Sequence, residues 1–109
     1  MPSPYTALLL FLAAVLEAGG DALIRRGLHA STAVRLGYYT IGSFFLFTYG
    51  YFVNIPPWDF GRLLGVYIAF FFLVAQVIGW MFFGHAPTGG TLLGGALIVA
   101  GGIVVYARG

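Results

Sequence analysis

Two carboxylates stand inside an apolar stretch near the start of the chain. Glu17 and Asp21 lie in a segment that begins at Pro4 and has no other charged residue before Arg25. A charged side chain at the centre of a bilayer costs about 2.5–3.5 kcal/mol on insertion scales, and such groups usually have a functional role. An apolar setting disfavours the charged form of a carboxylate, which lets a proton and a cation compete for it. Glu17 is therefore the candidate proton- and cation-binding group.

The neighbours of Glu17 allow more than one interpretation. Asp21 follows Glu17 by one helical turn and precedes Arg25 by another, so it either forms an i,i+4 ion pair with Arg25 or lies on the path of a substrate. Glu17 itself could instead be protonated and hydrogen-bonded to a neighbouring helix. Ala13 and Gly20 share its helical face, and their small size either admits a second helix or leaves room for a ligand.

The composition indicates that the solvent of this protein is lipid. The chain has 109 residues, of which 61% are hydrophobic and 7% are charged. Soluble domains carry about 25% charged residues, so a small soluble fold would have too few charges to cover its surface. The net charge of +2 is too sparse for a nucleic-acid surface, and the absence of cysteine excludes disulfides and thiol chemistry.

Four segments are candidates to cross a membrane, which takes about 20 mostly apolar residues. They cover residues 4–26, 34–53, 63–83 and 91–106, and their connections are too short to hold a further domain. Because lipid offers no partner for backbone polar groups, each segment should be a helix. The sequence therefore predicts an all-α membrane protein, with a single four-helix transmembrane domain over residues 1–109.

Tyr67 and two pairs of glycines are further candidate functional residues on the later segments. Tyr67 could hold an organic cation beside a carboxylate by a cation–π contact, although membrane aromatics more often face lipid. Gly94 and Gly101 are two helical turns apart, as are Gly95 and Gly102. Such stripes of small residues let helices approach closely, and the contact could lie within one subunit or between two.

The sequence shows no pattern of a catalytic centre. It contains no nucleophile–base constellation and no phosphate-binding loop, and His29 and His85 are lone loop histidines without convergent metal ligands. We therefore expect that the protein is not an enzyme, and that it holds no metal and no cofactor apart from a proton as coupling ion.

The arginines give little preference for one orientation in the membrane. If all four segments cross, Arg25, Arg26 and Arg35 lie on one side, and Arg62 and Arg108 lie on the other. Because an excess of Lys and Arg on one side sets topology, this near balance permits insertion in both orientations, while a weak bias toward one remains the alternative.

In their order and spacing, these residues resemble the small multidrug resistance superfamily of four-helix membrane transporters. The run Glu-Ala-Gly-Gly that begins at Glu17 and is followed by Arg25 is similar to the first-helix motif of that superfamily. The run Gly-Trp-Met-Phe-Phe-Gly at residues 79–84 is similar to the end of its third helix, and Gly94 and Gly101 match its seven-spaced glycines. Within the superfamily the chain looks closest to the YnfA-type branch, through Pro57, Gly61, Arg62 and Tyr67.

The departures from the superfamily concern the substrate. Leu64 stands where drug-exporting members have a tyrosine, Tyr67 where they have a tryptophan, and Asp21 where they have a threonine. Gly20 stands where guanidinium-exporting members have a tryptophan. Neither substrate class therefore carries over, and the missing aromatic at Leu64 implies weak binding of large, flat aromatic cations.

The resemblance implies a proton-coupled antiporter that exports small cationic compounds from a bacterial-type inner membrane. Its partners would be the lipid bilayer and a second copy of the chain, in an antiparallel homodimer with one shared central site. The implied substrate- and proton-binding residues are Glu17, Asp21, Tyr67, Ala13 and Gly20, and the implied dimer contacts are Gly94 and Gly101. The alternative is a membrane assembly or lipid-carrier flippase subunit, in which Glu17 pairs helices.

Overall fold

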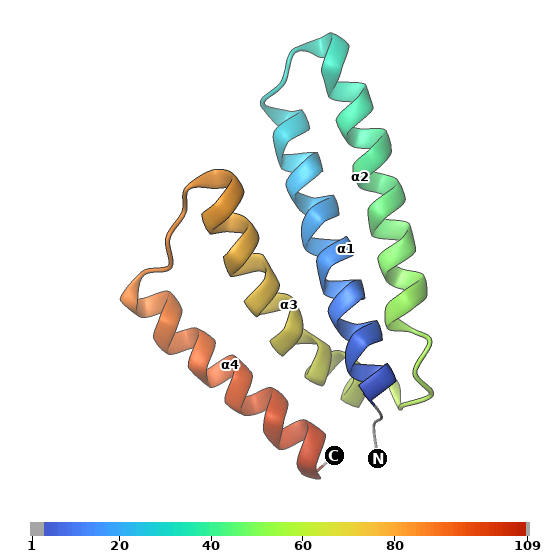
Figure 1. The fold of residues 1–109 in the computed structure, drawn as a ribbon, viewed down its shortest axis with the longest axis vertical. Coiled ribbons are helices and arrows are strands. Elements are labelled where there is room, and N and C mark those ends of the chain that lie inside the picture. The colour runs from blue at the N-terminus through green and yellow to red at the C-terminus, as the bar shows by residue number, and fades with distance from the viewer. Residues whose placement is uncertain (1–3, 109) are drawn as a thin grey trace.

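The computed structural model describes residues 4–108 and is all-helical over that range (Figure 1). The chain forms four helices, which confirms the predicted fold class at this level. Their bounds are α1 Pro4–Leu28, α2 Thr32–Val53, α3 Phe60–Phe83 and α4 Gly89–Arg108.

Local caps fix where the later helices begin and end. The Asp59 side chain accepts a hydrogen bond from the backbone N–H of Arg62 at 3.2 Å, and Thr88 Oγ1 accepts one from the N–H of Thr91 at 3.2 Å. Because these side chains satisfy N–H groups of the first turn, α3 and α4 begin slightly before the predicted residues. α3 ends at Gly84, whose φ of 69° lies in the left-handed region that favours glycine.

Three of the helices are long and apolar enough to cross a membrane, namely α1, α3 and α4. The chain is accordingly an integral membrane protein by the length and composition of these helices. α2 forms where a spanning segment was predicted and has 22 residues, but it is not among the three. It contains Arg35 and many tyrosine, threonine and glycine residues, which make it less apolar than the others.

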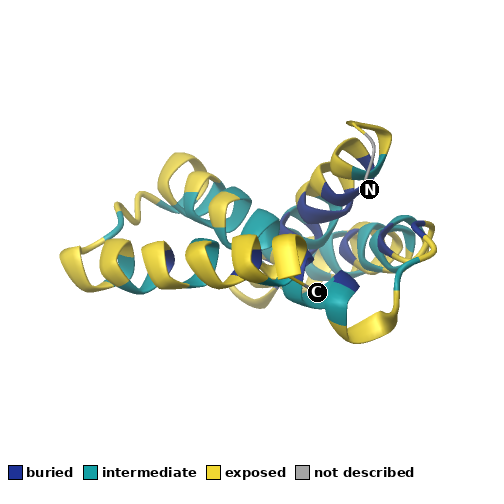
Figure 2. Ribbon diagram, turned by 90° about the horizontal axis from the view of Figure 1, so that it is seen from below, coloured by how far each residue is buried: buried dark blue, intermediate teal, exposed yellow. Residues whose placement is uncertain are grey.

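The helices form an open row rather than a closed bundle (Figure 1). α1 packs between α2 and α3, and α4 packs mainly on α3. The resulting body is flat, with Cα extents of 49 × 34 × 20 Å. Buried residues concentrate on α1 and its contacts, whereas α4 is mostly exposed (Figure 2). One side of α4 therefore has no partner within the described chain.

Glycines bring the backbones of neighbouring helices together. A Cβ atom added to Gly20 on α1 would lie 3.0 Å from the carbonyl oxygen of Gly42 on α2. A Cβ atom added to Gly102 on α4 would lie 2.8 Å from the Cβ of Ala69 on α3, and Gly95 meets α3 as closely. Larger side chains at these positions would push the helices apart.

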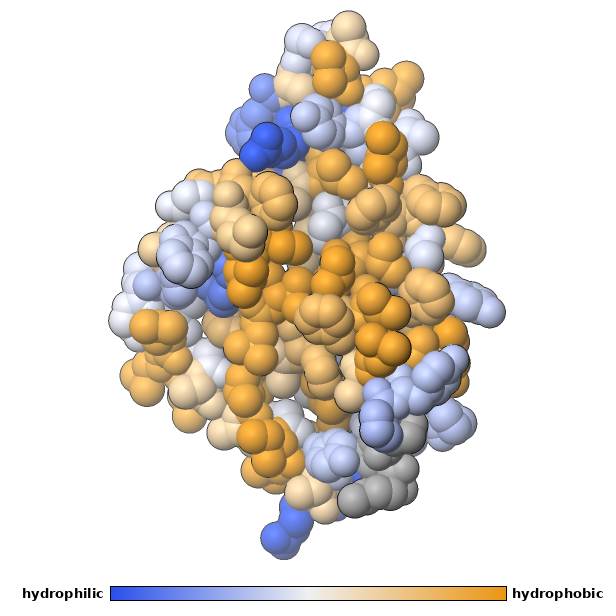
Figure 3. Space-filling view, in the orientation of Figure 1, coloured by the Kyte–Doolittle hydropathy of each residue, from blue (hydrophilic) through white to orange (hydrophobic). Residues whose placement is uncertain are grey.

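The core lies where α1, α2 and α3 meet. Its buried members are Leu10, Ala13, Ala14, Val53, Leu63, Val66 and Tyr67. Outside this core, large apolar side chains are exposed on all four helices. The middle of the face in Figure 3 is accordingly dominated by hydrophobic residues, as expected of a surface that meets lipid rather than water.

Candidate functional site

The central feature of the site is a hydrogen bond between Glu17 and Tyr67. The Tyr67 hydroxyl on α3 donates to Glu17 Oε1 on α1, with 2.8 Å between the two oxygens. Tyr67 is only 3% exposed, so the bond is held inside the three-helix core. The structure thus joins the two residues that the sequence singled out separately, the acidic one and the aromatic one.

A second tyrosine, on α2, completes the surroundings of the carboxylate. The ring of Tyr49 stacks on that of Tyr67, with 5.6 Å between centroids and 26° between planes. On the other side Phe71 lies 6.2 Å from the Tyr67 ring. The sequence analysis missed Tyr49, because nothing in the sequence distinguishes it from the other tyrosines of α2.

Asp21 lies in a groove beside this site. The groove has a volume of about 270 Å³ and runs between α1 and α3. Its wall includes Asp21 and Arg25 from α1, Phe71 and Phe83 from α3, and His85 from the loop after α3. Asp21 is exposed, and the groove connects its position to the loop end of the molecule.

Of the two roles that the sequence left open for Asp21, the ion pair with Arg25 is not formed in the structure. Within the described residues, no arginine comes within salt-bridge distance of Asp21. The guanidinium of Arg25 instead lies 5.5 Å from the centroid of the Phe83 ring at the end of α3. A cation–π contact of this kind holds the guanidinium away from the carboxylate one turn earlier. Asp21 therefore faces the groove without an arginine partner.

Ala13 and Gly20 serve helix packing. Ala13 is fully buried in the core, and Gly20 is buried against Gly42 of α2. The small residues on the Glu17 face of α1 thus admit a second helix in this structure. They are the reason why α2 comes close enough to place Tyr49 beside Tyr67.

The four seven-spaced glycines of α4 divide into two pairs with different surroundings. Gly95 and Gly102 are buried against α3, so this pair packs within one subunit. A Cβ atom added to Gly94 or Gly101 would have no neighbour within 4 Å. This second pair faces away from the rest of the described chain.

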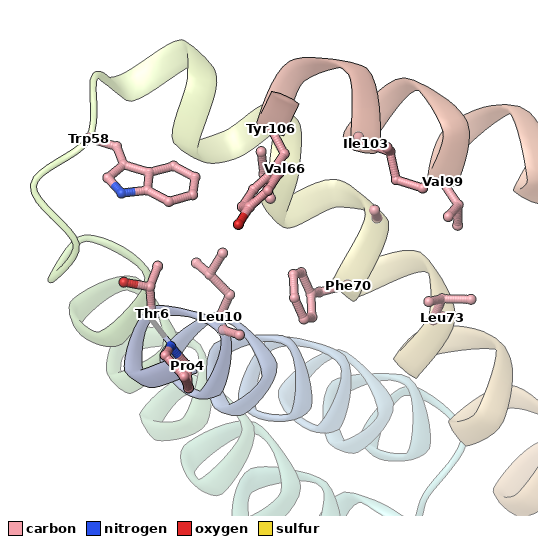
Figure 4. A pocket seen from close by; sticks show the side chains of 13 residues that line it. Pro4, Thr6, Leu10, Trp58, Val66, Phe70, Leu73, Val99, Ile103 and Tyr106 are labelled. Carbon is pink, nitrogen blue, oxygen red and sulfur yellow. The ribbon is translucent and has the colours of Figure 1, made fainter. Parts of the chain in front are cut away.

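A separate cavity of about 480 Å³ lies between the start of α1, α3 and α4 (Figure 4). Apolar and aromatic side chains dominate its wall, among them Leu10, Trp58, Phe70 and Tyr106. No carboxylate and no arginine lines it in the described chain. It therefore lacks the group that a cation would need, and we place the candidate site at Glu17.

The geometry defines a class of protein, an all-helical membrane protein with a hydrogen-bonded carboxylate inside its helix core. No protein-family model, no curated protein and no solved structure matches the chain. The resemblance to the small multidrug resistance superfamily accordingly stays a prediction from motifs, and the function is argued from the site.

Proposed function

We propose that this protein exchanges protons for small cationic compounds and exports the latter across a bacterial-type inner membrane. The observation that carries the proposal is the position of Glu17, a half-buried carboxylate in an apolar, membrane-length helix, with the Tyr67 hydroxyl 2.8 Å away. Intramembrane ionisable groups that face a bundle interior commonly mark ion and proton pathways.

The chemistry of exchange follows from the groups around Glu17. The carboxylate holds either a proton or a cation, because both need the same negative charge. The Tyr67 hydroxyl stabilises the charged form by hydrogen bonding. The half-buried ring of Tyr49 supplies an aromatic group for an organic cation, and Asp21 adds a second carboxylate in the adjoining groove, which Arg25 also lines.

The proposal includes four membrane crossings. α2 runs antiparallel beside α1 along its length and approaches it closely at Gly20 and Gly42 (Figure 1). A helix of 22 residues is about 33 Å long, which matches a hydrocarbon core of about 30 Å. Because α2 is packed along a spanning helix, it would lie at the same depth.

The proposal also includes an antiparallel homodimer of the kind found in the small multidrug resistance superfamily, which the motifs resemble. Two features support it, the near balance of arginines and the unpartnered Gly94 and Gly101 on α4. In such a dimer two Glu17 side chains would share one site, and the pair would titrate as a unit.

A second candidate function has one observation in its favour. The bond between Glu17 and Tyr67 joins α1 to α3 within a single chain, which is what a helix-pairing group would do. On this alternative the protein is a membrane assembly subunit or a lipid-carrier flippase subunit. It then has no reason to release a proton when a cation binds.

Proton release separates the two candidates. Purified protein in weakly buffered detergent is mixed with a panel of small organic cations while the pH is recorded, and the same cations are tested in proteoliposomes that carry a pH gradient. We expect at least one cation to release protons from the protein in detergent. In proteoliposomes the same cation should be transported in the direction opposite to the proton flow that the pH gradient drives. The absence of proton release across a broad panel, from folded protein, would reject exchange and favour the pairing role.

A further inference from the structure

A third cavity lies on the side of α1 that faces away from the carboxylate site. It has a volume of about 480 Å³ and is walled by α1, α2 and α3. Arg26 is its one charged lining residue in the described chain. Tyr38, near the start of α2, also lines it. The remaining wall is apolar or glycine, with Ile41, Phe45, Ile78, Phe82 and Leu23 among its members.

This groove lies away from Glu17 and from the outer face of α4, although Ala22, Ile78 and Phe83 line both this groove and the Asp21 groove. Glu17 and Arg26 are about two and a half helical turns apart, so they project from opposite sides of α1. The groove contains no residue of α4, whereas Gly94 and Gly101 lie on that helix. A second copy of the chain that meets this one at Glu17 and along α4 would leave the groove facing lipid.

The guanidinium of Arg26 is held at the rim of the groove, and the described chain uses only some of its N–H donors. Its Nη2 donates to the carbonyl oxygen of Phe82 at 2.8 Å, and its Cζ lies 5.4 Å from the Phe83 ring centroid. A guanidinium carries five N–H donors, so others remain for an anion. Arg26 also lies in the last turn of α1, at the depth where a spanning helix meets the lipid phosphates.

The one charged side chain that lines this groove in the described chain, Arg26, attracts an anion and repels a cation. Arg25 is next to Arg26 in the chain but lines the Asp21 groove, and Arg35 lies near the start of α2. The nearest acidic residue on α1, Asp21, lines the other groove, and no carboxylate lines this one among the described residues. The groove therefore suits neither the proposed cationic substrate nor a proton.

We propose that this groove binds one anionic phospholipid, with an acyl chain between α1, α2 and α3 and the phosphate on Arg26. The apolar wall matches the chain, and the guanidinium at the rim matches the phosphate, for which arginine is well suited. The site rests on the membrane placement of α1 and α3 and on the packing of α2 beside α1, and it holds whether or not Glu17 exchanges protons.

Native mass spectrometry of the detergent-purified protein tests this site. Phosphatidylglycerol and phosphatidylcholine with identical acyl chains are titrated separately, and glycerol 3-phosphate serves as a headgroup without chains. We expect phosphatidylglycerol to bind most tightly and glycerol 3-phosphate not to compete with it. Equal binding of the two lipids would refute the assigned role of Arg26. Full competition by glycerol 3-phosphate would refute the binding of an acyl chain in the groove.

Three variants locate the site. Arg26→Gln should weaken phosphatidylglycerol binding by about fivefold, the effect of one basic residue near a lipid surface. Arg108→Gln removes the same charge at the far end of the chain and should leave phosphatidylglycerol binding unchanged. Equal losses of lipid binding in both variants would mean a diffuse attraction between charges, and would overturn the proposal. Ile41→Trp keeps every charge and fills the groove, so it should also weaken binding.

Ile41→Trp also keeps the test decisive if Arg26→Gln does not fold. If Arg26→Gln does not retain its helix content by circular dichroism, Ile41→Trp alone decides. Unchanged lipid binding in folded Ile41→Trp would show that the groove is not the seat. A loss of dimer mass instead of lipid in that variant would show that a second copy, and not a phospholipid, covers the groove.

Discussion

At the scale of single residues, the function proposed here depends on one carboxylate and the hydroxyl that binds it. Glu17 is half-buried, and its partner Tyr67 is almost fully buried. In an apolar core such a bond is made because neither group has water as an alternative partner. The proton and a cation then compete for the same oxygen atoms, so the apparent affinity for the cation should fall as the pH is lowered.

The first prediction concerns the carboxylate itself. Glu17→Gln keeps the shape of the side chain but cannot titrate, so proton release and exchange should both disappear while helix content is retained. Glu17→Asp should keep exchange with an altered pH dependence, because the shorter side chain withdraws the carboxylate from Tyr67. The measurements are proton release in detergent and uptake in proteoliposomes. If Glu17→Gln behaves as wild type while Asp21→Asn loses proton release, the transport site lies one turn away.

The second prediction isolates the hydroxyl. Tyr67→Phe keeps the ring that stacks on Tyr49 but removes the hydrogen bond, and should lower the free energy of unfolding in micelles by about 1 kcal/mol. Tyr49→Phe is the matched control, because its ring is kept and its hydroxyl makes no hydrogen bond with residues 4–108. A double-mutant cycle with Glu17→Ala should show a coupling of about 0.5–3 kcal/mol between Glu17 and Tyr67. Independent effects in that cycle would mean that the bond does not form in the membrane.

At the scale of helices, small residues decide which faces meet. Gly20 and Gly42 bring α1 against α2, and the α4 pair Gly95 and Gly102 packs on α3. The α1–α2 contact helps to bring Tyr49 of α2 beside Glu17 of α1 and Tyr67 of α3. The remaining α4 pair has no neighbour within the described chain, which leaves it available to a second copy.

The third prediction contrasts the two glycine pairs of α4. Gly102→Leu would place its Cβ 2.8 Å from the Cβ of Ala69, which cannot rotate away, so it should destabilise the single subunit by about 1–3 kcal/mol. Gly94→Leu meets nothing inside the subunit and should leave its thermal unfolding in micelles unchanged while weakening dimerisation, as should Gly101→Leu. Dimerisation is measured by cross-linking in membranes and by native mass. A stable monomer in wild-type membranes, or unchanged dimerisation in both outer-pair variants, would contradict the assigned contact.

At the scale of the whole molecule, the helices form a flat, open row that leaves one side of α4 without a neighbour in the described chain. Its thinnest Cα extent is 20 Å, and α4 packs mainly on one neighbour. The carboxylate site lies on one side of α1 and the Arg26 groove on the other. A second copy placed over the first side would enclose the site, and lipid would meet the second side.

The fourth prediction concerns insertion. The chain has no cysteine, so a single His29→Cys reports its side of the membrane cleanly. If wild type inserts both ways, an impermeant thiol reagent should label about half of the protein from each side. His29→Arg combined with Ser31→Arg should fix one orientation, because it adds positive charge to one loop, and should stop transport.

Co-expression with a variant of the opposite bias controls this experiment. Asn54→Arg combined with Ile55→Arg adds charge to the loop on the other side, so the two variants together should restore antiparallel dimers and transport. Labelling of the wild type from one side only would show that the weak arginine bias already fixes the topology, and would remove the antiparallel arrangement.

The sequence by itself determined the all-helical fold, because sparse charge and long apolar segments leave helices as the only backbone structure that lipid tolerates. It also singled out Glu17 and Tyr67, since Glu17 is an acid in an apolar segment and Tyr67 is the one tyrosine of residues 63–83. Only the tertiary structure paired them, added Tyr49, and separated Asp21 from Arg25. Those outcomes depend on which helix faces meet. Close packing at glycines decides which faces meet, through contacts between residues far apart in the chain. Local spacing along the sequence does not encode such contacts.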